Sequence, residues 1–185
     1  MSYKIELKDA LKGYTYDQDK IMSPKETVAK FKEKTARLNL DILSRTRRID
    51  NGRLDIPIFF SECGTDAKNV IGTKKQMGKG GTPEQSEASA VMELAERFSF
   101  FSFVKKEENF FYSTPKALVE KALSYEQIIK SVHDNKKEAL KVKPIFDALP
   151  LKWTQGYDLA KKEEVLIPFN RSEERRVGKE CRSRW

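Results

Sequence analysis

The alternation of hydrophobic and polar positions predicts helices at several places along the chain. Ser23-Pro24-Lys25-Glu26 combines an N-cap serine, a proline at the first helical position and a glutamate at the third. We therefore expect a helix from Pro24 to about Leu38. A similar signal at Thr82-Pro83-Glu84-Gln85 predicts the longest helix, residues 83–104. Shorter helices are expected at residues 115–121, 124–133 and 136–148.

Short runs rich in β-branched and aromatic residues predict strands between these helices. Two of them, residues 40–49 and 54–61, flank the turn Asp50-Asn51-Gly52, and a short third strand is expected at residues 69–73. A glycine-rich turn at residues 78–81 then leads into the long helix. Near the end, residues 151–158 and 164–169 read as a hairpin. Strand pairs mixed with helices predict an α/β fold of the mixed α+β kind.

The last fifteen residues, RSEERRVGKECRSRW, differ in character from the rest of the chain. They resemble, residue for residue, the translation of a sequencing-library adapter. The alternative is a natural basic tail of the kind that binds nucleic acid. We take residues 171–185 as a non-native tail and residues 1–170 as the natural part. The hairpin stands directly before this tail, which predicts that the natural sequence is the N-terminal part of a longer domain.

Removing the tail changes the composition. It holds six of the 36 basic and three of the 28 acidic residues, so the formal net charge falls from +8 to +5. Lysine and glutamate are intermixed, whereas a nucleic-acid footprint needs clustered positive charge. Cys63 becomes the only cysteine, which excludes an intramolecular disulfide, and its place after an apolar strand favours a buried thiol. His133, beside Asp134, is expected at the surface. No signal peptide or membrane-length apolar run is present, and a cytoplasmic protein is expected.

The long helix has the most informative pattern. At about 100° per residue, its polar positions Ser86, Ser89, Glu93, Glu96 and Arg97 fall within an arc of about 100°. Most other positions are apolar, which predicts burial on most sides of the helix. Glu93 and Glu96, three residues apart, can reach a common hard cation such as Mg²⁺. The alternative is a solvated edge with an ordinary Glu93–Arg97 ion pair within the helix.

Together with the glycine turn, this helix resembles the signature segment of the YcaO family. The matching residues are Gly78-Lys79-Gly80, then Ser89-Ala90, Glu93, Glu96 and Arg97, followed by aromatic residues. Two further segments agree: R-L-D-I-P at residues 53–57 and the hairpin at residues 153–169. The resemblance extends from Lys20 to Asn170 and implies a YcaO-like fold, ended here after a hairpin in the middle of the domain.

The resemblance also implies a function. YcaO enzymes use ATP and Mg²⁺ to phosphorylate a peptide backbone amide, which leads to azolines or thioamides. It places Mg²⁺ on Glu93 and Glu96 and the nucleotide near Lys79, Ser89 and Arg97. A basic residue and, seven positions later, a hydroxyl residue also bind the nucleotide in this family, which implies Lys20 and Thr27. Further acidic residues and arginines come from the second half of the domain, so the present chain is expected to be inactive alone. The residues of the chemical step are not identified.

Three functions remain open at this point. The first is peptide-backbone modification by the full-length enzyme, with a peptide or protein substrate, a sulfur-transfer or leader-peptide-binding partner, and a homodimer as expected partners. The second is an accessory role in methylthiolation of a ribosomal protein. The third is a non-catalytic module that binds RNA or the ribosome. The retained Glu93 and Glu96 favour the first two.

Overall fold

The computed structural model describes residues 5–9, 20–130 and 136–169. The chain forms two compact units. The N-terminal unit comprises Lys8–Lys105, and the C-terminal unit comprises Met1–Leu7 with Lys106–Trp185. His133 and the tail at residues 171–185 lie outside the described residues, so their predictions stay untested.

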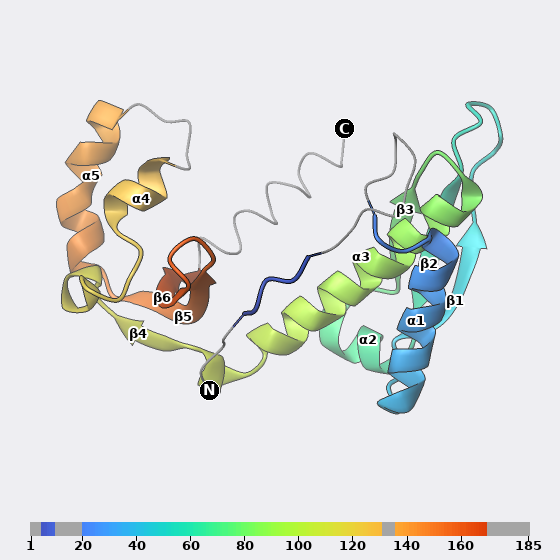
Figure 1. Cartoon of the computed structure of the whole chain (residues 1–185), viewed down its shortest axis with the longest axis horizontal. Coiled ribbons are helices and arrows are strands. Elements are labelled where there is room, and N and C mark those ends of the chain that lie inside the picture. The colour runs from blue at the N-terminus through green and yellow to red at the C-terminus, as the bar shows by residue number, and fades with distance from the viewer. Residues whose placement is uncertain (1–4, 10–19, 131–135, 170–185) are drawn as a thin grey trace. The chain divides into compact units, whose positions relative to one another are not determined.

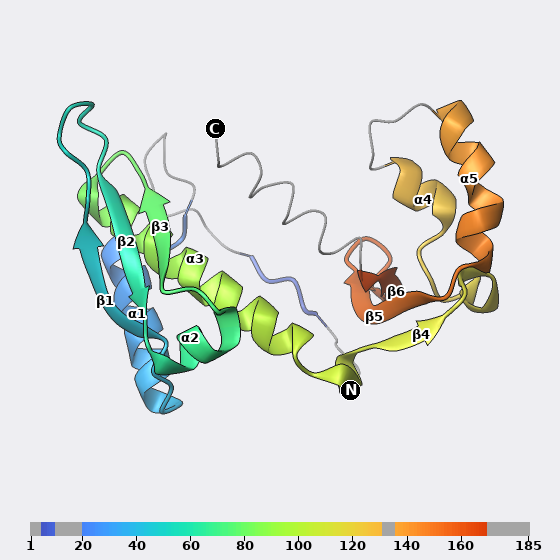
Figure 2. The ribbon, with the colours of Figure 1, turned by 180° about the vertical axis from the view of Figure 1, so that it is seen from behind.

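The N-terminal unit contains a three-stranded antiparallel sheet in the order β1-β2-β3. The strands are β1 (Leu43–Arg48), β2 (Ile58–Cys63) and β3 (Lys75–Lys79). Helices α1 (Pro24–Arg37) and α3 (Pro83–Val104) lie on one face of this sheet, as Figures 1 and 2 show from opposite sides. The mixed α/β class expected from the sequence is therefore confirmed.

Both predicted helix starts are present. Ser23 accepts a hydrogen bond from the Glu26 amide, and the Glu26 carboxylate accepts one from the Ser23 amide, which completes a capping box at α1. At α3, Thr82 accepts from the amide of Gln85 at 3.2 Å. The predicted bounds of α3 are confirmed at both ends.

The strand predicted at residues 69–73 is wrong. Helix α2 (Thr65–Ile71) occupies this region, and the third strand is β3, which takes in the first half of the predicted glycine turn. The apolar Val70 and Ile71 gave a strand-like pattern, but caps at both ends of the segment decide the structure. The Asp41 carboxylate accepts from the Thr65 amide at 2.7 Å, and Gly72, at φ 76°, ends the helix in the left-handed conformation.

The second strand begins later than expected, at Ile58 rather than Leu54, because side chains organise the connection. The Asp50 carboxylate accepts from Arg48 at 2.7 and 2.9 Å and from the Ile58 amide at 3.0 Å. Asp55 has a positive φ of 49°, which a strand does not allow. The residues between β1 and β2 therefore form an ordered loop rather than a tight turn.

The core of the N-terminal unit is formed by Ile42, Cys63, Ala67 and Leu94, with Phe31 and Phe98 packed against it. Cys63 is fully buried, as predicted, and burial raises the pKa of its thiol. Four buried residues of α3 face the sheet and α2: Ser86, Ala90, Val91 and Leu94.

The C-terminal unit has a second antiparallel sheet in the order β4-β5-β6. The predicted hairpin is confirmed as β5 (Leu151–Asp158) and β6 (Glu163–Pro168). The short β4 (Phe111–Ser113) was not predicted. The remaining elements are the 3₁₀ turns η1 (Glu107–Asn109) and η2 (Pro115–Leu118) and the helices α4 (Tyr125–Lys130) and α5 (Lys136–Ala148). The predicted helix at residues 136–148 is confirmed, and the one at 115–121 is only a 3₁₀ turn.

Candidate functional site

The position of α3 on the sheet depends on a close approach at Gly78. A Cβ atom at this residue would lie 2.5 Å from the carbonyl oxygen of Ser86 and 2.7 Å from the Cα of Ala90. These distances are too short for any side chain, so only glycine allows β3 to touch the backbone of α3 here. The first glycine of the family-like segment thus has a packing role.

Two buried hydroxyl groups tie the same part of α3 to the sheet. The Ser61 hydroxyl on β2 donates to the carbonyl of Ala90 at 2.8 Å. In the other direction, the Ser86 hydroxyl on α3 donates to the carbonyl of Pro57 at 2.6 Å. Both serines are fully buried. The hydrogen bonds and the contact at Gly78 together fix the position of the first three turns of α3 on the sheet. They therefore also determine where Glu93 and Glu96, farther along the same helix, lie relative to the sheet.

The remaining glycines connect β3 to α3. The Gln85 side chain accepts a hydrogen bond from the Gly81 amide at 2.9 Å and thereby closes the turn against the helix. A Cβ at Gly80 would lie 2.7 Å from the Gln85 Cβ. The turn is therefore held by its own helix. The capping pattern from Thr82 to Gln85 predicted the start of this helix from the sequence. It did not predict that the Gln85 side chain also accepts a hydrogen bond from Gly81.

Glu93 and Arg97 form an ion pair within α3. The Arg97 Nε lies 2.8 Å from the Glu93 Oε1, and the two side chains are 22% and 37% exposed, Arg97 being the more buried. This is the contact expected if the polar side of α3 is a solvated edge with an ordinary ion pair, the alternative to a metal site. A carboxylate already paired with arginine still has a second oxygen to offer a cation, so the pair alone does not decide between the two interpretations.

The other polar positions lie farther from the sheet. Ser89 and Glu96 are exposed, whereas Ser86 is buried against it. The expected burial on most sides of α3 holds in part: the side that faces the sheet is buried and most other apolar positions are half-buried, but Met92 is 44% exposed. The polar arc thus runs from the buried edge of the helix, at Ser86, to its exposed side, at Glu96.

Thr27 lies on α1, which packs beside α3 on the same face of the sheet. Its hydroxyl donates to the Ser23 carbonyl at 2.9 Å. Lys25 and Glu84 link the first turns of the two helices, with a Lys25 Nζ to Glu84 Oε1 distance of 3.6 Å. The first helix and the glutamate helix are therefore neighbours, as the nucleotide assignment requires.

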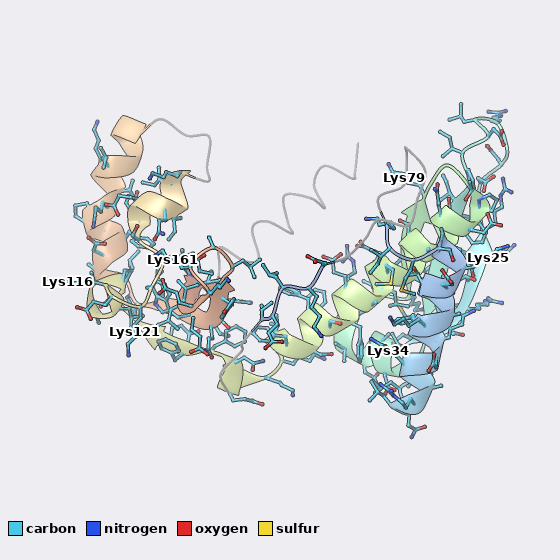
Figure 3. The ribbon with its side chains drawn as sticks, in the orientation of Figure 1. Lys25, Lys34, Lys79, Lys116, Lys121 and Lys161 are labelled. Atoms are coloured by element: carbon cyan, nitrogen blue, oxygen red, sulfur yellow. The ribbon has the colours of Figure 1, made fainter. Side chains whose placement is uncertain are left out.

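Lys20 and Lys79 are both exposed. Lys20 precedes α1, and Lys79 is the last residue of β3, where Figure 3 labels it. Alternation along the strand turns the Lys79 side chain away from the face on which Gly78 meets α3. The structure thus brings Thr27 and the two glutamates to one side of the sheet, whereas the Lys79 side chain is turned towards the other face.

The acidic residues available for a metal ion are few. Within the described ranges, no group of three or more His, Cys, Asp or Glu side chains is placed to hold one. Glu93 and Glu96 supply two carboxylates from neighbouring turns of one helix, and Mg²⁺ is commonly held by one or two carboxylates together with substrate phosphates. This donor set fits a magnesium ion shared with a nucleotide and does not fit a cage made by the protein alone.

The signature segment matches a known family. Residues 77–173, more than half of the chain, match the model described as YcaO cyclodehydratase, ATP- and Mg²⁺-binding. The chain belongs to the YcaO family. The resemblance inferred from the glycine turn and the E-x-x-E-R helix is therefore confirmed, and the match begins at Met77, directly before that turn.

Two solved structures support the fold. A heterocyclase in complex with substrate and cofactor is similar with a TM-score of 0.57 and 19% identity, over 90% of this chain and 24% of that one. YcaO from Methanopyrus kandleri bound with AMPPCP and Mg²⁺ gives a TM-score of 0.50 and 18% identity, over 85% of this chain and 35% of that one. The chain thus spans only a quarter to a third of these proteins. No curated protein is similar enough to the chain to count as a match.

No described helix is both long enough and apolar enough to cross a membrane.

Proposed function

We propose that the full-length protein containing this chain is an ATP- and Mg²⁺-dependent enzyme that activates a peptide backbone amide by phosphorylation. The observation that carries the proposal is the pair Glu93 and Glu96 on α3, inside the segment that matches the ATP- and Mg²⁺-binding family. The proposed cosubstrate is ATP, and the product is an azoline or a thioamide. A cytoplasmic location, where ATP is abundant, belongs to the same proposal.

In the proposed reaction, the amide oxygen of the substrate attacks the γ-phosphorus of ATP and ADP leaves. A cysteine, serine or threonine side chain, or an external sulfur donor, then attacks the activated carbonyl carbon. The oxygen departs as phosphate, and the proton of the nucleophile is released. Bound magnesium would neutralise the negative charge that develops on the phosphoryl oxygens.

The chain's own residues have distinct proposed tasks. Glu93 and Glu96 would hold magnesium, and the Arg97 guanidinium would keep the Glu93 carboxylate in one orientation through the 2.8 Å contact. Thr27, beside α3 on the neighbouring helix, and Ser89, on the exposed side of α3, would contact the nucleotide. Lys20 and Lys79 would approach it as flexible cations, because both side chains are exposed.

Buried contacts between α3 and the sheet support the assignment of Glu93 and Glu96 as magnesium ligands. Ser61, Ser86 and Gly78 fix α3 on the sheet with hydrogen bonds of 2.8 and 2.6 Å and a backbone contact. Carboxylates on a fixed helix lose little conformational freedom when a cation binds, which favours a metal site over a solvated edge.

The test is phosphate release by the full-length protein with Mg-ATP and a peptide substrate. Glu93→Gln and Glu96→Gln preserve side-chain shape and remove one negative charge each, so we expect turnover to fall by about 100-fold or more. Glu33→Gln, which removes an exposed carboxylate of α1, is the matched control and should leave turnover unchanged. Circular dichroism should show the same helix content in all three variants.

Wild-type turnover in both glutamate variants would refute the assignment of the metal site. ATP turnover that depends on both glutamates but never modifies a peptide would instead favour the accessory role in ribosomal protein methylthiolation. The family's nucleotide-binding description argues against a purely non-catalytic RNA-binding module.

A further inference from the structure

The face of the first sheet that is turned away from α3 has an unusual composition. Strand alternation and the pairing register place on it the side chains that we call the basic sheet face. Its members are Arg45, Arg47, Phe60, Glu62, Lys75 and Met77. Figure 2 shows this side of the sheet, with α1 and α3 behind the strands. In the described part of the N-terminal unit, no helix covers it.

The basic sheet face is built from two cross-strand rows. The first row is Arg45, Glu62 and Lys75, and the second is Arg47, Phe60 and Met77. Because the rows are two residues apart along each strand, they are separated by about 7 Å. An extended peptide presents successive side chains of one face at about the same interval, so a peptide that crosses the two rows diagonally can place acidic side chains at Lys75 and Arg47 with an apolar one between them.

The charges of this face are only partly neutralised. Glu62 lies 2.5 Å from Arg45, and the hydrogen bond from Arg45 lowers the pKa of the Glu62 carboxyl. One carboxylate therefore faces three cations. Arg47, which is exposed, has no ion pair with any other described residue, and the exposed Lys75 ammonium rests 4.9 Å above the Phe60 ring. The face therefore carries an excess of positive charge that an acidic partner would neutralise.

Apolar groups stand among these charges. Phe60 is only 9% exposed, but its cross-strand neighbour Met77 is 67% exposed. At one end of the sheet, the loop after β1 exposes Leu54 by 80% and Ile56 by 49%. A merely solvated sheet face is expected to be polar throughout, whereas arginine, methionine and aromatic residues together are typical of protein interfaces.

We propose that the basic sheet face docks an extended acidic peptide segment whose acidic side chains alternate with apolar ones. The acidic groups would pair with Arg47 and Lys75, and the apolar groups would cover Met77 and the edge of Phe60. A second copy of this chain is a poor occupant, because the chain is itself positively charged, at +8 with its last fifteen residues and +5 without them. The proposal is independent of the nucleotide site, and Lys79 is left out of it.

The test uses the 185-residue chain and fluorescence anisotropy with a labelled peptide of Glu-Ser-Leu-Ser repeats, which alternates glutamate and leucine along one face of an extended strand. Arg47→Glu combined with Lys75→Glu should raise Kd by about 10-fold or more. Lys32→Glu combined with Lys116→Glu makes the same change of net charge at exposed lysines outside this face and should leave Kd nearly unchanged. Met77→Ser, which alters no charge, should raise Kd a few-fold.

Three probes set the limits of the proposal. A Lys-Ser-Leu-Ser peptide should not bind, and a Glu-Ser-Ser-Ser peptide should bind more weakly than the leucine-containing one. Equal weakening by the two double charge reversals would mean binding through net charge alone and would overturn the proposal. Tighter binding of oligothymidylate that depends on Arg47 and Lys75 would overturn it in favour of nucleic acid. A dimer that dissociates on Met77→Ser would overturn it in favour of a second copy.

Discussion

The two units of the chain hold their sheets together in different ways. In the N-terminal unit, small residues bring backbone against backbone: Gly78 meets α3, and Ser61 and Ser86 bond to carbonyls across the interface. In the C-terminal unit, one large side chain dominates. Trp153 is fully buried, its indole nitrogen donates to the Ser113 carbonyl at 2.9 Å, and it is the largest buried side chain of the described residues.

The difference shows which kind of substitution each unit resists. A unit fastened by close backbone contact fails when a residue becomes larger, and a unit built around one aromatic residue fails when that residue becomes smaller. Close backbone contact also fixes the position of a helix along the strands of its sheet. It therefore suits the unit that carries Glu93 and Glu96.

Truncation of the aromatic residue should have the largest effect. Trp153→Ala removes the centre of the C-terminal unit and should cost about 3–5 kcal/mol of stability. We expect hydrogen exchange in β4, β5 and β6 to accelerate, measured by mass spectrometry. Trp153→Phe keeps most of the volume and loses only the hydrogen bond to Ser113, so it should cost about 1 kcal/mol. Equal exchange in the alanine variant and the wild type would contradict this view of the unit.

Enlargement should be the sensitive change in the N-terminal unit. Gly78→Ala places a Cβ within 2.7 Å of the Ala90 Cα and should cost about 1–3 kcal/mol, because two backbones must separate. Gly81→Ala is the matched control: its Cβ would meet only the movable Gln85 Oε1, at 3.2 Å. Urea denaturation followed by circular dichroism measures both. Similar midpoints for the two variants would show that the contact at Gly78 can relax.

The same contrast explains what the sequence could predict. Helices α1 and α3 were found because their caps are local patterns, as was the hairpin of β5 and β6. The glycine and E-x-x-E-R pattern was enough to identify the family. Local signals therefore predicted the main elements and the candidate residues.

Long-range contacts account for the errors. Asp41 caps Thr65 from 24 positions earlier, so α2 read as a strand. Gly78 read as part of a turn because its contact with Ala90 joins two elements and leaves no local pattern. The burial of Ser86 likewise depends on Pro57, 29 positions away. The ion pair between Glu93 and Arg97, which one interpretation of the sequence predicted, is present in the structure, since i,i+4 pairs are local.

Loss of a buried hydroxyl should have a smaller effect than enlargement of Gly78. Ser61→Ala removes the donor to the Ala90 carbonyl and should cost about 1 kcal/mol. Ser99→Ala is a close control, because Ser99 also donates to a carbonyl of α3, that of Ala95 at 2.8 Å, but on the exposed side. Alanine favours helix there, so stability should be unchanged or rise by a few tenths of a kcal/mol. If both substitutions cost the same, the buried bond is not what fastens α3.

The smallest expected effect concerns pH and the loop between β1 and β2. Hydrogen bonds from Arg48, and then from the Ile58 amide, hold the pKa of the Asp50 carboxyl far below its usual range. Because this pKa is lower in the folded than in the unfolded protein, ionised Asp50 stabilises the fold fully above about pH 4. That contribution is lost progressively as the pH falls below this value towards the folded pKa.

Asp50→Asn should therefore be less stable than the wild type at neutral pH, and the difference should shrink between about pH 4 and pH 2. Asp55→Asn makes the same charge change in the same loop, at an exposed residue, and should keep the wild-type pH dependence. Urea midpoints at several pH values measure all three proteins, and subtraction removes the other carboxylates whose pKa is lowered, such as Glu62 and Asp41. A constant difference between the wild type and Asp50→Asn across this range would mean that the carboxylate acts through its shape rather than its charge. The loop would then be held as α3 is held on its sheet, by uncharged contacts.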